Sequence, residues 1–144
     1  MKKRSPLKRL SAKEAKIKAE YRRVCKEIDE EMMDEFGYLM CTSCHVNATR
    51  APLGHSHNLP KGRFKLLETD KRNISLRCQN FGGHKGCHEK LDDGDIEAIV
   101  KFDDFEDIMA YRYENAPEEY NKMVMAIIKA GLDIDIGYNE FIYT

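Results

Sequence analysis

Apolar residues recur at steps of three and four between residues 11 and 36, a stretch without proline or glycine. That spacing places them on one stripe of a helix. Ser11 followed by Glu14 is a capping box, which predicts where the helix begins, and Gly37 predicts its end. Cys25 lies on the stripe, so we expect it to be a small core residue. The sequence thus predicts one long amphipathic helix near the N-terminus.

The central residues have shorter patterns, which favour strands and turns. Residues 38–41 and 73–78 are expected to be extended, and His57 is expected to end a strand before the turn at Pro60. The glycine-rich residues 79–86 predict a loop, after which a helix begins with the pair Cys87 and His88. These elements are too short to bury much apolar surface, so we expect a metal ion to stabilise them.

The pattern beyond residue 92 is helical again. Helices are expected over residues 95–102, over 105–113 and from about 116 to 130, the last with Pro117 at its first position. We expect an extended tail after it. The predicted organisation is a basic arm (1–10), an N-terminal helix (11–37), a central unit (38–92) and an acidic, mainly helical extension (93–144). The fold class is therefore α+β.

Composition and charge limit the possible partners. The chain of 144 residues is 42% hydrophobic and 34% charged, which is typical of one soluble domain. It has no apolar run of membrane-spanning length and no apolar leader, so we expect a cytoplasmic protein with reduced thiols. Residues 1–23 hold ten Lys or Arg and two Glu, which indicates nucleic acid as a partner or a solvated tail. Residues 89–144 hold fifteen acids and five bases, a region that could dock a protein partner or a second copy.

Four of the five cysteines, and all five histidines, fall within residues 41–88. Zinc sites built on thiolates usually take two pairs of cysteines. The first pair has the common two-residue spacing, and the second is separated by eight residues that include three glycines and His84, a substitute ligand. The alternative is a set of buried free thiols, but reduced cysteines in this spacing favour zinc. The four predicted ligands are Cys41, Cys44, Cys78 and Cys87.

The histidines suggest a second chemistry. Hydrolysis of a phosphodiester needs a group that takes a proton from the attacking water, and a cation on the phosphate. His57 is a suitable general base if another group holds its ring. Asn73 can orient a ring or a backbone segment across a hairpin, and His88 can bind the cation. Asp92 lies four residues further along the same helix face and His55 shares a strand face with His57, so both are candidate further ligands.

The ordered set Cys-x2-Cys, Ser-His-x-x-Pro, Asn-x4-Cys and Cys-His over residues 41–92 resembles the HNH endonucleases, which carry the ββα-metal fold. Residues 5–38 are similar in style to small phage-encoded members. The resemblance implies a DNA endonuclease that uses Mg²⁺, Mn²⁺ or another divalent cation, and that acts in the host cytoplasm if it is phage-encoded. It implies that His57 is the general base, Asn73 the central asparagine and His88 a metal ligand, and that the four cysteines hold a structural zinc.

We therefore expect a zinc-stapled ββα-metal core between an N-terminal helix and a C-terminal helical extension. Many members of the family place Asp or His directly before the base as a metal ligand, where this chain has Ser56. This difference leaves open a catalytically decayed, zinc-stapled module that binds nucleic acid or acts as an adaptor. Six basic residues flank the site, either as phosphate contacts or as ordinary surface, namely Lys61, Arg63, Lys65, Lys71, Arg72 and Arg77.

Overall fold

The protein has an α+β fold in which one small sheet lies between helices. The computed structural model describes residues 10–134; the arm and the tail expected from the sequence therefore fall almost entirely outside the described residues. The elements are α1 (Ala12–Phe36), β1 (Leu53–His57), β2 (Ile74–Cys78), α2 (Cys87–Asp92), α3 (Ile96–Ile99), α4 (Phe105–Asn115) and α5 (Pro117–Lys129), with the short 3-10 turns η1 (Lys65–Leu67) and η2 (Lys71–Asn73) between the strands.

Helix α1 begins and ends where its capping residues predict. The side chain of Ser11 accepts a hydrogen bond from the Glu14 amide at 3.1 Å. Gly37 has a φ of 79°, a left-handed conformation that glycine adopts without steric penalty, and its amide donates to the Met33 carbonyl at 2.8 Å. Cys25 is buried in the contact of α1 with the sheet, as predicted.

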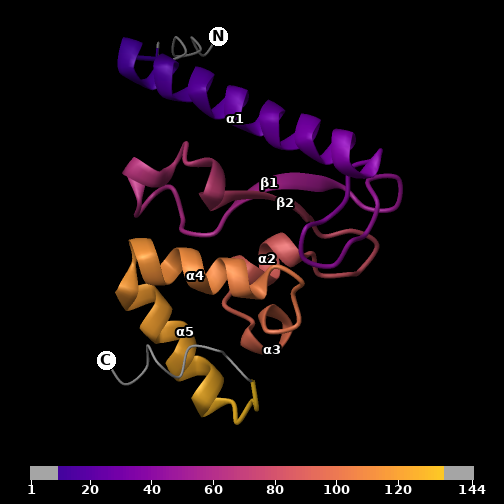
Figure 1. Ribbon diagram of the computed structural model, residues 1–144, viewed down its shortest axis with the longest axis vertical. Helices are drawn as coiled ribbons and strands as arrows, with labels where there is room; N and C mark the ends of the chain where they lie inside the picture. The colour runs from indigo at the N-terminus through magenta and orange to yellow at the C-terminus, as the bar shows by residue number, and fades with distance from the viewer. Residues whose placement is uncertain (1–9, 135–144) are drawn as a thin grey trace, which may run out of the picture.

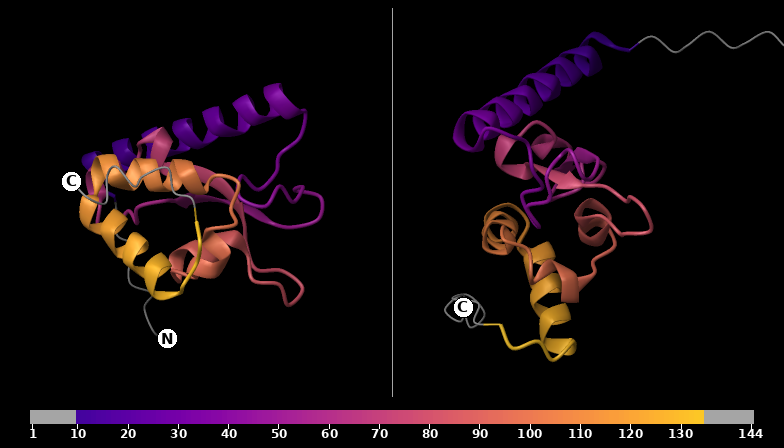
Figure 2. Two further views of the ribbon diagram at one scale, coloured as in Figure 1. Left: turned by 60° about the horizontal axis from the view of Figure 1, so that its bottom comes forward. Right: turned by 90° about the vertical axis from the view of Figure 1, so that its right-hand side faces the viewer.

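The two strands form an antiparallel hairpin. His57 pairs with Ile74 at one end, where residues 58–73 connect the strands, and Leu53 pairs with Cys78 at the other. Helix α1 packs against one face of the hairpin, while α2 and α4 lie on the opposite side (Figures 1 and 2). A two-stranded sheet is marginal alone, so this layering stabilises it. The predicted strand at residues 38–41 is reduced to one bridge, between Met40 and Asn47.

The C-terminal helices differ from the expectation at one place. The helix expected over residues 95–102 stops after Ile99, and the chain then turns toward the first cysteine pair, where the Asp103 amide donates to the Ser43 carbonyl at 3.0 Å. Helix α5 begins at Pro117, as predicted. The cysteines at 41, 78 and 87 share one buried cluster with residues of α2, α3, α4 and α5. The extension is therefore built onto the cysteine centre.

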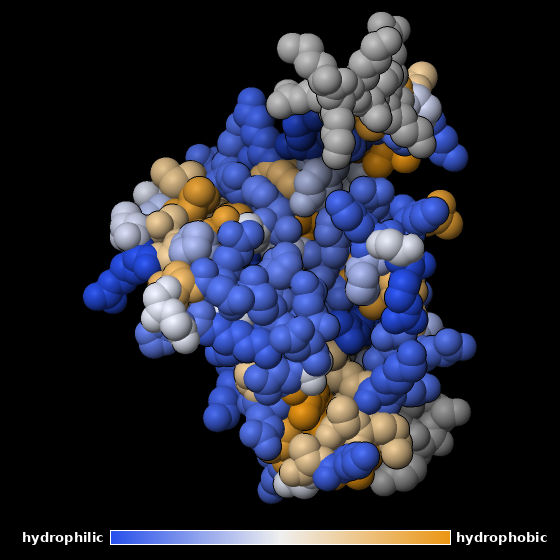
Figure 3. Space-filling view, turned by 180° about the vertical axis from the view of Figure 1, so that it is seen from behind, coloured by the Kyte–Doolittle hydropathy of each residue, from blue (hydrophilic) through white to orange (hydrophobic). Residues whose placement is uncertain are grey.

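Seen from behind, the surface is mostly hydrophilic, and its largest apolar area lies at the bottom of the molecule (Figure 3). Met125 and Ile128 of α5 are exposed. Among the helices between residues 10 and 134, none combines the length and the apolar character that a bilayer crossing demands.

Candidate functional site

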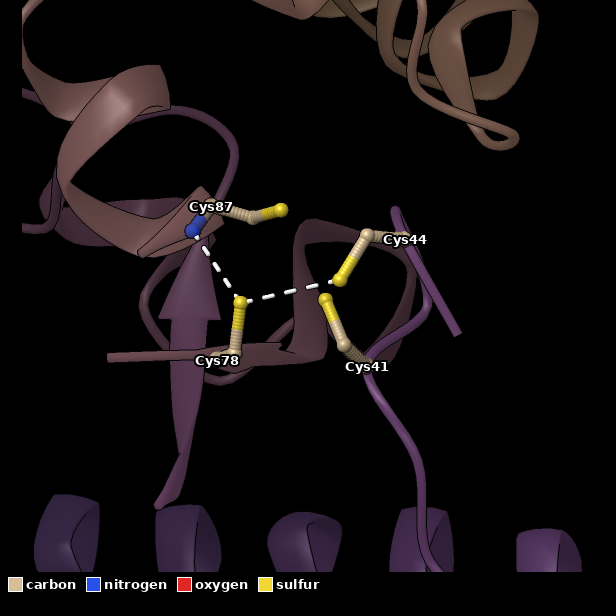
Figure 4. A group of neighbouring side chains, drawn as sticks. All are labelled: Cys41, Cys44, Cys78 and Cys87. Atoms are coloured by element: carbon tan, nitrogen blue, oxygen red, sulfur yellow. Dashed lines mark hydrogen bonds between the residues drawn. The ribbon is translucent and has the colours of Figure 1, made fainter. Parts of the chain in front are cut away.

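The first cysteine pair lies on a tight turn before β1. The turn is closed by hydrogen bonds from the His45 amide to the Cys41 carbonyl at 2.8 Å and from the Cys41 amide to the Val46 carbonyl at 2.9 Å. His45 has a φ of 67°, the left-handed conformation that this turn requires. The turn brings the side chains of Cys41 and Cys44 to the same side of the chain (Figure 4).

The second pair joins the end of β2 to the start of α2. Cys78 is the last residue of β2 and Cys87 the first of α2. The loop between them folds back because the Gly86 amide donates to the Asn80 side chain at 2.8 Å. A Cβ atom at Gly86 would lie 2.4 Å from the Cys78 carbonyl oxygen, so only glycine fits there. The wide spacing of this pair is therefore compatible with one compact site.

All four thiol sulfurs lie within 4.8 Å of one another (Figure 4). The sulfurs of Cys44 and Cys78 are 3.7 Å apart, close to the separation of about 3.8 Å that a tetrahedral zinc with Zn–S bonds of about 2.3 Å requires. The Cys87 amide also donates to the Cys78 sulfur at 3.3 Å. All four cysteines are free thiols. The four cysteines can therefore hold a metal ion such as zinc; His84, the substitute ligand, is exposed and lies against Phe81 instead.

The thiols of this group titrate very differently. A hydrogen bond from Cys87 lowers the pKa of Cys41 to about 4. Burial raises the pKa of Cys44 to about 11, and the contact with Cys41 raises the pKa of Cys87. Thiolates this close repel one another, so all four ionise together only against a cation. The chemistry of the donor set thus fits a divalent metal that prefers sulfur.

His57 lies at the opposite end of the hairpin from the cysteines. Its Nε2 is 2.9 Å from the Glu68 carbonyl oxygen, and its ring stacks on Tyr21 of α1 with the ring centres 5.5 Å apart. A carbonyl oxygen only accepts, so Nε2 carries the proton and Nδ1 of the neutral ring is left as the acceptor. Tyr21 and Glu68 thus hold the ring, and neither has a sequence motif that could have identified it.

Asn73 is buried and holds the turn that follows His57. Its Oδ1 accepts from the Leu59 amide at 2.7 Å, and its Nδ2 donates to the carbonyls of Leu59 at 3.0 Å and Leu67 at 3.1 Å. Its own carbonyl accepts from the Asn58 amide at 2.8 Å. The predicted orienting asparagine therefore fixes the backbone on both sides of the hairpin connection.

The remaining predicted residues do not form one group. His55 faces α1, with its Nε2 2.8 Å from an oxygen of Asp29. His88 lies on α2, and its Nε2 is 3.1 Å from the carboxylate of Asp92. Among residues 10–134, the cysteines are the one set of three or more Cys, His, Asp or Glu side chains close enough to share an ion. His55 and His88 are therefore not brought together, because α1 and α2 lie on opposite sides of the hairpin (Figure 1), whereas Asp92, the other expected ligand, lies beside His88.

Arg77, expected as a phosphate contact or a surface residue, is buried instead. Its side chain is 1% exposed and its Nη2 lies 2.7 Å from a carboxylate oxygen of Asp104, which is itself 7% exposed. The Ser43 hydroxyl donates to the same carboxylate at 2.8 Å. The prediction was wrong because the face of β2 opposite Leu76 is covered by the extension. This buried ion pair links β2, the first cysteine turn and the chain before α4.

A second buried arginine binds the residue next to His57. Arg112 of α4 donates to the side chain of Asn58 at 2.7 Å and to its carbonyl at 3.0 Å. Asn58 in turn donates to the Ile108 carbonyl at 3.0 Å. Burial lowers the pKa of Arg112. No local pattern could have paired two residues so distant in the sequence, so this contact was not predicted.

The geometry is thus a group of four cysteine thiols that can hold a metal ion such as zinc, and a hairpin end where His57 is held by a carbonyl and an aromatic ring. Comparisons of the chain with protein-family models, with curated proteins and with solved structures find no match. What this arrangement does must therefore be inferred from its own residues.

Proposed function

We propose that the protein is a metal-dependent DNA endonuclease of the HNH type, with zinc on the four cysteines. The chain order β1, β2, α2 is the order that the resemblance to this family implies, and the cysteines join β2 to α2. Such a staple stabilises a small unit that has little core of its own. The basic N-terminal sequence supports a polyanion as the partner.

The observation that carries the proposal is the hydrogen bond that holds the His57 ring at Nε2. The Glu68 carbonyl fixes the proton on Nε2, so Nδ1 has the lone pair that a general base needs. Tyr21 restricts the ring from one side, and Asn73 holds the turn that follows. A histidine held in one tautomer takes a proton from water near neutral pH. In the proposed reaction, His57 accepts the proton of the water whose oxygen attacks the phosphorus atom. The bond from phosphorus to the leaving oxygen of the sugar breaks, and that oxygen takes up a proton from solvent.

His88 is the residue best suited to a catalytic cation. Asp92 holds its Nε2, and its Nδ1 is a buried atom without a hydrogen-bond partner among the described residues. This is the usual arrangement of a metal-binding histidine, with a carboxylate on the other ring nitrogen. The Ser56 hydroxyl is likewise buried without a partner within residues 10–134, and strand alternation points it away from α1. When bound, the cation would supply charge stabilisation at the phosphate; Asp92 then orients the ligand rather than binding the ion.

The second candidate is a zinc-stapled module that binds nucleic acid, or acts as an adaptor, without cleaving it. It is favoured by the placement of His57 and His88, because His57 contacts Tyr21 of α1 and His88 contacts Asp92 of α2, on opposite sides of the hairpin. Ser56 also offers only a hydroxyl, a weak ligand for a divalent cation, at the position before the base. This candidate shares the zinc centre and the DNA partner with the first, and differs from it only because it does not cleave the DNA.

A nicking assay on supercoiled plasmid separates the two candidates. With Mg²⁺ or Mn²⁺ added, we expect the wild type to nick the plasmid and His57→Ala to be slower by about 10² to 10⁴-fold, the usual contribution of a general base. His84→Ala is the matched control, because His84 is exposed, its ring lies against Phe81, and it belongs neither to the hairpin end nor to the group of four cysteines. Zinc content and far-UV circular dichroism should be the same in all three proteins.

The outcomes are distinct. Loss of nicking in His57→Ala but not in His84→Ala supports the endonuclease. Binding of DNA by all three proteins, with no cleavage under any divalent metal, overturns the endonuclease in favour of the binding module. Equal nicking by the wild type and His57→Ala would show that another group is the base.

A further inference from the structure

Leu66 is the most exposed large apolar residue of the described chain, with 97% of its surface accessible. Full burial of a leucine side chain stabilises a fold by about 1.5–3 kcal/mol, and a leucine exposed to solvent does not contribute this free energy. A single exposed leucine is common on protein surfaces. Its surroundings therefore decide whether it has a role.

The segment that carries Leu66 is anchored on both sides. Its neighbours Phe64 and Leu67 are partly buried against the cluster of Leu59, Tyr111 and Ala116. The amides of Phe64 and Leu67 make backbone hydrogen bonds of 3.0 and 2.9 Å, and the carbonyl of Leu67 accepts from Asn73. Leu66 is therefore presented on an ordered turn, since the nearest apolar side chains before and after it, Phe64 and Leu67, hold that turn in place.

The same segment is basic. Residues 60–67 contain Lys61, Arg63 and Lys65 and no acidic residue. Lys61 and Lys65 are exposed and form no ion pair within residues 10–134, whereas Arg63 pairs with Glu119 at 2.7 Å. Two unpaired cations around an apolar tip are complementary to a polyanion with an apolar interior. Duplex DNA has both features, with phosphates outside and stacked bases inside.

The segment is also connected to the candidate base. Two residues after Leu66, the Glu68 carbonyl holds Nε2 of His57. In Figure 1, this connection lies at the end of the hairpin away from the cysteine centre. A nucleic acid bound at the tip would thus lie near the hairpin end that holds His57.

We propose that residues 61–67 bind duplex DNA, with Leu66 inserted between two base pairs and Lys61 and Lys65 on the flanking phosphates. Proteins that use this mode insert a leucine or a similar side chain, unstack the step and bend the duplex. The inference rests on DNA being the partner of the proposed function. It does not require cleavage, because insertion holds equally for a binding module.

The test is binding to a short A·T-rich duplex that contains 2-aminopurine, measured without added Mg²⁺ or Mn²⁺. Unstacking at the inserted step raises the fluorescence of 2-aminopurine. We expect the wild type to give this rise, and Leu66→Ala to lose it and bind about tenfold more weakly. Met125→Ala is the matched control, since Met125 is 62% exposed on α5 and lies outside the basic segment. Because Leu66 is exposed, its replacement should leave the thermal stability unchanged.

A double variant, Lys61→Ala with Lys65→Ala, tests the phosphate contacts. The slope of log affinity against log salt should fall by about two, and the fluorescence rise should persist at low salt. Identical fluorescence and affinity in the wild type and Leu66→Ala would overturn the inference, even if the wild type nicks plasmid. Leu66-dependent fluorescence in a protein that never cleaves DNA would support the inference and reject the endonuclease. Binding of a protein, but no duplex, would overturn both.

Discussion

The hydrogen bonds of Asn73 allow a worked prediction of stability. Replacing Asn73 with alanine removes one acceptor and two donor contacts, at 2.7, 3.0 and 3.1 Å, from a residue that is 1% exposed. The buried amide of Leu59 loses its partner, at a cost of about 1–3 kcal/mol, and each carbonyl that loses one donor adds about 0.5–1.5 kcal/mol. Partial relaxation and water entry reduce the sum. We expect Asn73→Ala to lower the free energy of unfolding by about 3 kcal/mol.

Urea unfolding followed by circular dichroism measures this loss. With a slope of about 2 kcal/mol per molar, the midpoint should fall by about 1.5 M. Asn115→Ala is the matched control, because Asn115 is exposed at the end of α4 and its side chain makes one hydrogen bond, to the Tyr111 carbonyl at 3.0 Å. That variant should lose less than about 1 kcal/mol. Zinc content should be unchanged in both, since Asn73 lies at the opposite end of the hairpin from Cys78.

A loss of less than about 1 kcal/mol for Asn73→Ala, similar to that of the control, would refute the reasoning. It would mean that the turn after His57 is held by other contacts, and that the asparagine does not orient the backbone around the candidate base.

Three further predictions concern the metal centre, a buried ion pair and a phenol. The purified protein should hold one equivalent of zinc. Its apparent affinity for zinc should rise with pH, because Cys44 and Cys87, whose pKa values are raised, must lose protons when zinc binds. Calorimetry in buffers of different ionisation enthalpy counts those protons. Arg77→Ala should destabilise the protein by about 3–5 kcal/mol in urea unfolding, because it leaves the Asp104 carboxylate buried and unpaired, whereas Arg77→Met combined with Asp104→Leu should recover most of the loss. Burial raises the pKa of Tyr21 from its ordinary 10 to about 12. The neutral phenol therefore contributes to the stability of the fold below pH 10, and this contribution is lost as the pH rises to 12. The wild type should therefore lose more stability than Tyr21→Phe between about pH 9 and about pH 11.5, and equal losses would contradict this.

Local sequence signals predicted the helices that have caps. Ser11 with Glu14 and Gly37 set the bounds of α1, and Pro117 set the start of α5, because each satisfies or removes a backbone group at a helix end. The helix expected over residues 95–102 is shorter than predicted, since the Asp103 amide finds its partner on the first cysteine turn rather than within the helix. That choice depends on a neighbour distant in the sequence.

The strand pattern predicted which residues share a face, but not what covers it. Alternation placed His55 with His57, and the structure shows both facing α1. Nothing local could tell that Asp29 and Tyr21 would lie opposite them, or that Arg77 would be enclosed by the chain before α4. For this reason His55, one of the two residues expected to join His88 at a cation, lies on the other side of the hairpin from it.

The sequence by itself determined the candidate ligand set, because two pairs of cysteines in this order favour a metal site, and their residue type carries the chemistry. Only the tertiary structure decided how the histidines are used. A ring's tautomer, its access to water and its distance from a cation depend on groups from other elements, such as the Glu68 carbonyl at His57 and the Asp92 carboxylate at His88. Those groups are brought there by packing, which acts between residues that the order of the chain keeps apart.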